Sequence, residues 1–507
     1  MVFSSIIFTT IFLPLCLLAY YGIPRLKGGS YANRIKLSNI ILLIFSLVFY
    51  AFGGVKYLLL IGIVIFINWA GGFLCASNRH SRRFNKISLI SVVVIDLGIL
   101  FFFKYFNFFI AIIENIFFGG ELSVPERFTN LFSGVGTGAL NLPEIVLPVG
   151  ISFFTFQALS YVIDVYNDQV EVQSSFWYFA LYISCFPQLI AGPIVHYKDI
   201  SGQLTERSVG SYEFAAGIKR FCFGLGKKVI IANTLASIAD KIWAADISQL
   251  DATVAWLGSI AYTFQIYYDF SGYSDMAIGL GKMFGFDFKE NFDHPYRAES
   301  VREFWRRWHI SLSTWFRDYV YIPLGGSRCS MKKTCGNIFI VFLLTGIWHG
   351  ANWTFITWGF YHACLFLPLI LLNHNRKHTD VVAFGRWLPS LKESGQILLT
   401  FALVTIGWII FRCTGIPSTT AFLTDIFSPN ALAATWKFFV VPDFPVARAG
   451  IIIMIIVEWI QRDKEHGLQD IDNHIRSKNL RCGLYIISIV LIFFFRGDYA
   501  TFIYFQF

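Results

Sequence analysis

The sequence FDHPYRAESVREFWRRWHISLSTWFRDYVYIPLGG (residues 292–326), with the apolar run that follows it and ends in GIWHGANW (residues 346–353), decides the fold of this chain. The first part is rich in Arg and Trp and contains His309, and the second carries His349 where hydrocarbon is expected. Polar groups removed from water without compensation cost free energy, and ionisable residues inside membranes face the protein interior or a water-filled path. The stretch therefore predicts membrane helices that enclose an interior site.

The composition of the 507-residue chain indicates an all-α polytopic membrane protein. Hydrophobic residues make up 55% of it, its mean hydropathy is +0.58 and only 14% of its residues are charged, against about 25% in soluble domains. The net charge of +9 comes from Lys and Arg in short loops between apolar runs, where such residues set topology. We therefore expect a lipid bilayer, and no nucleic acid, among its partners.

Apolar runs of about 20 residues, the length needed to span a bilayer, predict about eleven or twelve transmembrane helices. The first run, 5–23, precedes a basic loop, so the N-terminus is expected outside the cytoplasm. FPQLIAGPIV (186–195) is short and broken by Gly and Pro, which predicts a re-entrant segment around a central tunnel. We expect a transmembrane core over residues 1–482, and a last helix with an extracytoplasmic tail over residues 483–507.

The cysteines indicate neither a disulfide framework nor a metal site. Nine are scattered along the chain, and an odd number without paired spacing argues against disulfides. Cys329 and Cys335 share a loop, but no second Cys or His pair completes a zinc site. We expect no metal cofactor.

His349 lies between Trp348 and Gly350 near the end of an apolar run. One interpretation is a buried imidazole that hydrogen-bonds across helices. The other is a general base, because a neutral imidazole can take a proton from a hydroxyl. The flanking glycines favour the second interpretation, because they let a substrate approach closely.

His309 is expected on one continuous helix over FWRRWHISLSTWFRDYV (304–320), where positions three and four apart share a face. One interpretation is an interfacial amphipathic helix with Trp anchors and Arg side chains that reach water. The alternative is the mouth of a passage for an anionic ligand, where Arg binds phosphate and Trp stacks on adenine. Coenzyme A fits that chemistry, and so does a lipid head group. The candidate donor-binding residues are Arg302, Trp305, Arg306, Trp308 and Arg317.

A second polar stretch, DFSGYSDMAIG (269–279), lies in an otherwise apolar helix. Charged residues at this depth usually face the bundle interior or a water-filled path, so Asp269, Ser271 and Tyr273 are candidates for binding the donor or lining the tunnel. The alternative is a structural role, in which they hold the re-entrant pieces by hydrogen bonds.

The C-terminal sequence TFIYFQF (501–507) carries Tyr504. Aromatic residues are common at the membrane interface, so one interpretation is an interfacial anchor. Residues 497 to 504 reach about 23 Å when extended, and half the hydrocarbon core is about 15 Å thick. The alternative is a phenol that enters a shaft from outside and approaches a central histidine.

Six segments resemble the membrane-bound O-acyltransferases, in particular the bacterial branch that O-acetylates polysaccharides. None is specific alone, but together they extend over most of the chain and form a specific set. They are MVFSSIIFTTIFLPL (1–15), LPVGISFFTFQ (147–157), FPQLIAGPI (186–194), YDFSGYSDMAIG (268–279), FDHPYRAESVREFWRRWHISLSTWFRDYVYIPLGG (292–326) and GIWHGANW (346–353).

The resemblance implies a funnel-shaped helical fold with a tunnel through a thin partition. His349 would match the catalytic histidine of the partition, and His309 the second signature position, which we expect at the cytoplasmic entrance with the Arg cluster. Acetyl-CoA would donate the acyl group from the cytoplasm, and an extracytoplasmic polysaccharide would receive it. The tail resembles the aromatic end of a small accessory peptide in the related D-alanylation system, which implies that Tyr504 is an acyl acceptor. The implied location is the cytoplasmic (inner) membrane of a bacterium, and the implied partner is a secreted or membrane-anchored acetyltransferase with a Ser nucleophile.

Two other functions remain open at this point. D-alanyl transfer from a carrier protein to teichoic acid would use the same fold with another donor, although the YIPLGG sequence (321–326) and the fused tail are less typical of it. A membrane transporter would also contain broken helices and buried charges, but it gives no reason for FIYFQF (502–507). We expect the acetyltransferase.

Overall fold

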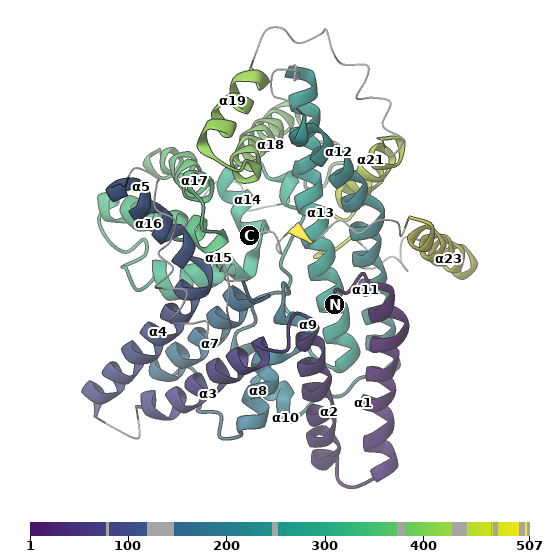
Figure 1. Ribbon diagram of the computed structural model, residues 1–507. Coiled ribbons are helices and arrows are strands. Elements are labelled where there is room, and N and C mark those ends of the chain that lie inside the picture. Colours follow the sequence, from purple (N-terminus) through teal and green to yellow (C-terminus); the bar gives the residue numbers. More distant parts are fainter. Residues whose placement is uncertain are drawn as a thin grey trace, which may run out of the picture.

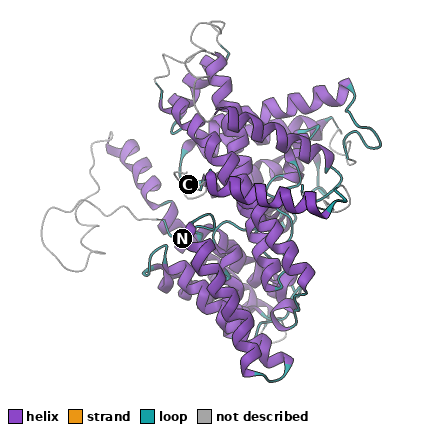
Figure 2. Cartoon of the chain, turned by 90° about the vertical axis from the view of Figure 1, so that its right-hand side faces the viewer, coloured by secondary structure: helices purple, strands orange, loops and turns teal. Residues whose placement is uncertain are grey.

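The computed structural model describes residues 1–77, 81–118, 147–245, 252–372, 381–427, 444–467, 469, 475–495 and 502–503. These residues form helices joined by loops and turns, without a strand (Figure 2). Seven helices within these ranges are long and apolar enough to cross a membrane, judged by length and composition. The all-α polytopic class is thereby confirmed, whereas the number of spans and the side of each terminus stay predictions.

The helices of the first 205 residues, except α5, form the lower part of the view in Figure 1. Serines precede three of them, and the side chains of Ser30, Ser81 and Ser175 accept the backbone N–H three residues further on. Each bond satisfies a donor that a helix start leaves open. The elements are η1 (Phe8–Phe12), α1 (Leu13–Lys27), α2 (Tyr31–Ala51), α3 (Tyr57–Cys75), α4 (Arg82–Lys104), α5 (Phe106–Phe118), α7 (Ile151–Tyr166), α8 (Phe176–Ser184), α9 (Phe186–Leu189) and α10 (Tyr197–Thr205).

The remaining helices surround the centre and upper part of the same view (Figure 1). Among them, α13 is the longest at 33 residues and is almost entirely buried, so it forms the central helix of the fold. The elements are α11 (Ser211–Gly226), η2 (Lys227–Ala232), α12 (Asn233–Ala244), α13 (Ala252–Phe284), η4 (Pro295–Arg297), α14 (Val301–Arg307), α15 (Ile310–Phe316), η5 (Arg317–Tyr321), α16 (Met331–His349), α17 (Trp353–Leu371), α18 (Leu391–Arg412), α19 (Ile416–Ile426), α21 (Phe444–Ile460) and α23 (Lys478–Phe494).

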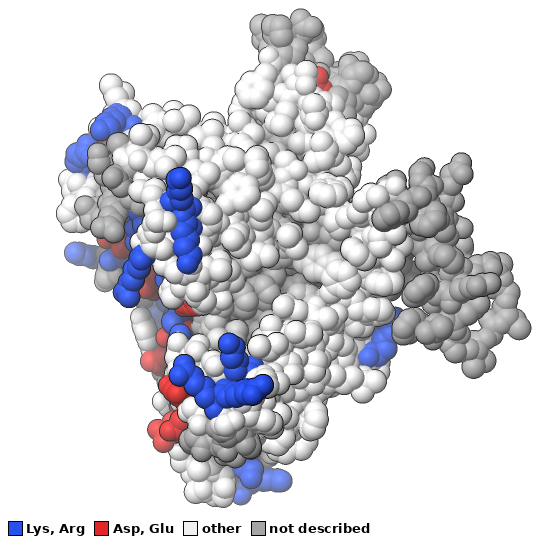
Figure 3. Space-filling model, turned by 90° about the vertical axis from the view of Figure 1, so that its left-hand side faces the viewer, with Lys and Arg blue, Asp and Glu red and all other residues white. Residues whose placement is uncertain are grey.

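The surface is divided between charged and uncharged regions. On the face drawn in Figure 3, most Lys, Arg, Asp and Glu side chains gather along one edge, and a broad area beside them carries none. Large apolar side chains such as Leu59, Phe66 and Val94 are more than half exposed. Contiguous apolar surface of this kind suits contact with lipid.

Helices α11 and α13 pack closely because glycines of each face the backbone of the other. A Cβ added at Gly272 would lie 2.7 Å from the carbonyl oxygen of Gly224, and one added at Gly279 would lie 2.6 Å from that of Gly217. Small residues let membrane helices approach in this way. The contact brings buried acidic residues of α13 against basic residues of α11 and η2.

Helices α16 and α17 also pack closely at glycines, beside His349. A Cβ added at Gly346 or at Gly359 would lie 3.2 Å from the carbonyl carbon of Phe355 or of Phe342, respectively. The glycines therefore hold α16 against α17 close to the C-terminal end of α16, where His349 is the last helical residue.

Two segments differ from what the sequence predicts, which is a single apolar run over residues 88–118 and a basic loop that contains the Lys and Arg residues between 198 and 228. Residues 88–118 form α4 and α5 with a break at Tyr105, rather than one helix. The basic stretch 211–228 is helical rather than a loop, because Lys227 and Lys228 are buried and paired with acidic residues of α13. Basic residues indicate a loop where their side chains are solvated by water. Where they are buried and paired with carboxylates, as here, they can lie within a helix.

Candidate active site

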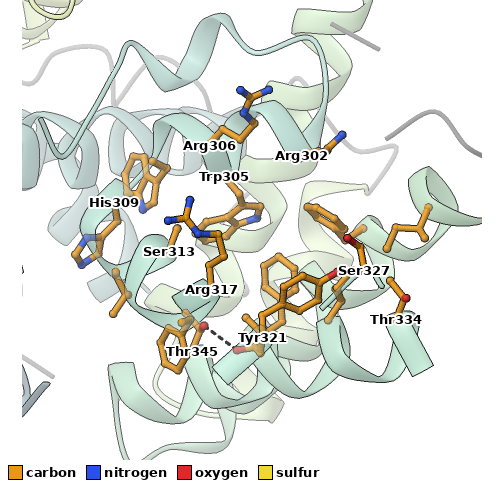
Figure 4. A pocket seen from close by; sticks show the side chains of 18 of the residues that line it. Arg302, Trp305, Arg306, His309, Ser313, Arg317, Tyr321, Ser327, Thr334 and Thr345 are labelled. Carbon is orange, nitrogen blue, oxygen red and sulfur yellow. Dashed lines mark hydrogen bonds between the residues drawn. The ribbon is translucent and has the colours of Figure 1, made fainter. Parts of the chain in front are cut away.

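A cavity of about 600 Å³ lies between the segment 302–327 and helices α16 and α17 (Figure 4). Its walls come from α14, α15, η5, α16 and α17. The cavity brings together the sequence-predicted donor-binding residues of the Arg/Trp segment and both histidines. These are Arg302, Trp305, Arg306, Trp308, His309, Arg317 and His349.

The two histidines are neighbours at the buried part of this cavity. His309 is 1% exposed and His349 is 5% exposed. Both rings pack against Trp348, whose ring centroid lies 6.0 Å from that of His309 and 5.0 Å from that of His349. His309 shares this cavity with the Arg cluster, as expected, but it is buried near His349 rather than separated from it.

A break in the backbone at His309 explains this position. Its φ is 45°, a left-handed conformation that an α-helix does not contain, and α14 ends at Arg307 before α15 begins at Ile310. The single helix expected over residues 304–320 is therefore wrong. Trp305 and His309 do not share a helical face, although both line the cavity.

Asn291 orients the His309 ring. Its side-chain oxygen accepts hydrogen bonds from the backbone N–H and the hydroxyl of Ser311, at 3.2 and 2.9 Å, and lies 3.2 Å from Nδ1 of His309. The N–H donor identifies this atom as oxygen rather than amide nitrogen. Because it only accepts, Nδ1 carries the proton of the neutral ring and Nε2 is the basic nitrogen. Complete burial favours that neutral form.

A second, smaller cavity of about 60 Å³ also borders His349. Its lining includes Lys104 of α4 and Ser152 of α7, elements that contribute nothing to the lining of the large cavity. Trp348 is the other residue of α16 that faces it. His349 is therefore among the lining residues of both cavities.

Lys104 and Tyr105 hold the end of α16 that carries His349. The Lys104 ammonium donates to the carbonyl of Trp348 at 2.6 Å and to the hydroxyl of Ser152 at 3.3 Å, and the Tyr105 hydroxyl donates to the carbonyl of Ile347 at 2.8 Å. The last carbonyls of a helix have no partner within it, and a cation there is stabilising. Sequence reasoning missed both residues, although a lysine inside the apolar run FFFKYFNFF (101–109) was the available signal.

The arginines surround the more open part of the large cavity (Figure 4). Arg306 and Arg317 are exposed and Arg302 is half-buried. Arg317 also pairs with Asp318, at 2.7 Å between Nε and Oδ1. A cationic rim that leads to buried imidazoles suits a ligand with an anionic body and an uncharged reacting end.

Asp269, Ser271 and Tyr273 do not line this cavity. They lie on α13, where Asp269 pairs with Lys228 of η2 at 2.6 Å and the Tyr273 ring contacts Phe502. The structure therefore does not bring them together with the arginines of the large cavity. Asp269 and Tyr273 face the C-terminal segment, and Ser271 borders a different cavity beside Arg220 and Lys227.

Tyr504 lies outside the described residues. The two residues before it are described: Phe502 is 3% exposed and Ile503 is 2% exposed. The C-terminal segment thus enters the protein interior at residues 502–503.

Within the described ranges, no group of three or more His, Cys, Asp or Glu residues is placed to hold a metal ion. The groups that the large cavity does bring together are two imidazoles, three guanidinium groups and two indoles. This set can transfer protons and bind an anionic ligand.

All the residues that line the large cavity fall within one family match. Residues 167–392 match the profile described as MBOAT, membrane-bound O-acyltransferase family. The matched region contains His309 and His349 and the arginines of the rim, but not Lys104 or the C-terminal segment.

Individual proteins extend the similarity over nearly the whole chain. The chain is 45% identical to the "Probable alginate O-acetylase AlgI" of Pseudomonas aeruginosa, over 81% of this chain and 72% of that protein. It is 30% identical to the "Peptidoglycan O-acetyltransferase" of Helicobacter pylori, over 100% of this chain and 98% of that protein. It is 28% identical to the "Teichoic acid D-alanyltransferase" of Bacillus subtilis, over 52% of this chain and 68% of that protein.

Proposed function

The chain belongs to the membrane-bound O-acyltransferase family, and we propose that it moves an acetyl group from cytoplasmic acetyl-CoA through the membrane for the O-acetylation of an extracytoplasmic polysaccharide. Family membership makes it a multi-pass membrane acyltransferase. The acetyl group and the polysaccharide are supported by two relatives named as O-acetylating enzymes of alginate and peptidoglycan. Membership of an acyltransferase family also favours an enzyme over the transporter interpretation.

One observation carries the proposal: His349 borders two cavities whose walls, apart from α16, come from different parts of the chain. A group that touches both cavities can take a proton from an acceptor on one side while the acyl donor lies on the other. His349 is then the general base. His309, oriented by Asn291, lies beside it on the donor side.

The large cavity fits the donor. Its volume of about 600 Å³ is within the usual range for a ligand site of roughly 300–1,000 Å³. Arg302, Arg306 and Arg317 would bind the phosphates at the rim, and Trp305 would stack on the adenine. The thioester would then lie at the buried end beside the histidines.

Tyr504 is the proposed first acceptor, and Phe502 and Ile503 already lie buried in the interior. The phenol oxygen forms a bond to the acetyl carbon, the carbon–sulfur bond breaks, and His349 receives the phenol proton and returns it to the departing thiolate. The aryl ester retains enough transfer potential to acetylate a sugar hydroxyl. The order thioester, aryl ester, alkyl ester is downhill.

The second transfer needs a partner. We propose a secreted or membrane-anchored acetyltransferase with a Ser nucleophile, which accepts the acetyl group from Tyr504 and delivers it to the polysaccharide. The protein would lie in the cytoplasmic (inner) membrane of a bacterium with both termini outside the cytoplasm, so that the tail and the partner meet on the outer side.

Donor exchange tests the proposal against D-alanyl transfer, which the similarity to teichoic acid D-alanyltransferases keeps as the second candidate. Purified protein given acetyl-CoA is expected to gain an acetyl adduct on its C-terminal peptide, measured by mass spectrometry. A D-alanyl carrier protein is expected to give none. An adduct with the carrier protein and none with acetyl-CoA would reverse the assignment of donor.

Replacing Asn291 by alanine is expected to slow acetyl transfer about 10- to 100-fold, the range for residues that orient a functional imidazole. The loss should fall on kcat rather than on the KM for acetyl-CoA, because Asn291 holds the ring and does not line the cavity. Asn337→Ala is the matched control, since this buried amide donates to the carbonyl of Leu324 and lines neither cavity. Equal losses in both variants would contradict an orienting role.

A further inference from the structure

The C-terminal segment is held in the interior by its last described residues. Phe502 and Ile503 are 3% and 2% exposed. The helix before them, α23, has one buried residue, Ile492, and lies at the edge of the molecule in Figure 1. Among the described residues from 478 onward, Ile492, Phe502 and Ile503 are the buried ones.

Asp269 binds the backbone of this segment. The N–H of Ile503 donates to Oδ2 of Asp269 at 2.8 Å, and Oδ1 of the same carboxylate pairs with the Lys228 ammonium at 2.6 Å. Asp269 is 1% exposed and Lys228 is 5% exposed. A buried ion pair offsets its desolvation only when other hydrogen bonds satisfy the remaining lone pairs. The Ile503 N–H supplies such a bond and fixes the backbone at residue 503, while the side-chain contacts of Phe502 distinguish this register of the chain from its neighbours.

Aromatic contacts hold the preceding residue and link it to the active site. The Tyr273 ring lies 4.6 Å from the ring of Phe502. The Phe270 ring lies 6.2 Å from Phe502 and 4.7 Å from His309. A single side chain thus bridges the docked segment and a histidine of the large cavity.

We propose that Asp269, supported by Lys228, is a positioning residue that sets the register of the C-terminal segment, so that Tyr504 is presented to the histidines at a fixed depth. The inference rests on the proposed function, in which Tyr504 accepts the acetyl group. It assigns Asp269 and Tyr273 of α13 to docking of this segment rather than to donor binding. The carboxylate does not touch the reacting atoms and acts through the backbone of residue 503.

Ile503→Pro tests the proposal, because proline lacks the N–H and leaves the Asp269–Lys228 pair intact. Ile503→Val keeps the N–H and is the matched control. The full chain in detergent is measured in two ways: hydrogen–deuterium exchange of the C-terminal peptide, and the rate of acetyl adduct formation on that peptide from acetyl-CoA. Ile503→Pro is expected to raise the exchange and to slow adduct formation on the order of 10- to 100-fold, as expected for a misplaced reacting group. Ile503→Val is expected to resemble the wild type in both.

The two readouts separate the docking contact from the chemistry. Unchanged exchange in Ile503→Pro overturns docking through Asp269, and raised exchange with an unchanged adduct rate overturns its positioning role. A wild-type protein that forms no adduct on Tyr504 overturns the proposed acceptor instead, while the exchange data still decide the docking contact. Asp269→Asn provides a second test that keeps an acceptor oxygen for the N–H. Because it also removes the negative charge that faces the buried Lys228 ammonium, thermal unfolding is measured beside it, and the folded variant is expected to shift both readouts less than Ile503→Pro.

Discussion

His349→Gln is expected to reduce acetyl transfer about 10²- to 10⁴-fold, the contribution of a positioned general base. Glutamine is polar and of comparable length, but its amide does not take a proton from a phenol. The imidazole lines both cavities, and its ring packs 5.1 Å from Trp358 and 5.2 Å from Phe411. The rate of adduct formation from acetyl-CoA measures the loss, and acetyl-CoA binding is expected to persist because the arginines of the rim are unchanged.

His196→Gln is the control for removing a buried imidazole. His196 is 4% exposed and its Nδ1 lies 3.2 Å from the hydroxyl of Tyr319, but it lines neither cavity. The His196→Gln variant is expected to transfer the acetyl group at the wild-type rate, per amount of folded protein. Thermal unfolding of both variants separates a loss of fold from a loss of chemistry. Transfer by His349→Gln within about threefold of the wild type would remove the general-base assignment, since base catalysis contributes far more.

Tyr504→Phe is expected to abolish acetylation of the C-terminal peptide, because it deletes the oxygen that forms the ester and leaves the ring. O-acetylation of the polysaccharide by protein and partner together is expected to fall to background. The first readout is the mass of the C-terminal peptide after incubation with acetyl-CoA. The second is the release of acetate from the recovered polymer.

Tyr485→Phe provides the matched phenol deletion within the same C-terminal region. Tyr485 lies on α23, and its removal is expected to change neither readout. Polysaccharide O-acetylation that continues in Tyr504→Phe would show that the acetyl group reaches the polymer without passing through this residue. Loss of polymer acetylation with a retained adduct elsewhere on the peptide would place the acceptor at another residue.

Much of the site was predictable because polar residues are rare in so apolar a chain. His309, His349 and the arginines stand out against 55% hydrophobic composition, and all of them line one cavity. Lys104 and Asn291 were not found by the same reasoning. Their roles depend on contacts across the fold, such as that between Lys104 and the carbonyl of Trp348, 244 positions away.

The sequence by itself determined the membrane class, the helical architecture and the ionisable residues that must lie inside it, because hydrocarbon tolerates few polar groups and each must be enclosed. Only the tertiary structure decided which of these ionisable residues lie in contact with one another. The left-handed backbone at His309, with φ of 45°, brings this residue beside His349, and the carboxylate of Asp269 meets the backbone of Ile503, 234 positions away. Such contacts depend on how closely glycine-lined helices pack and on which buried charges then find partners. Local patterns along the chain do not encode these distances.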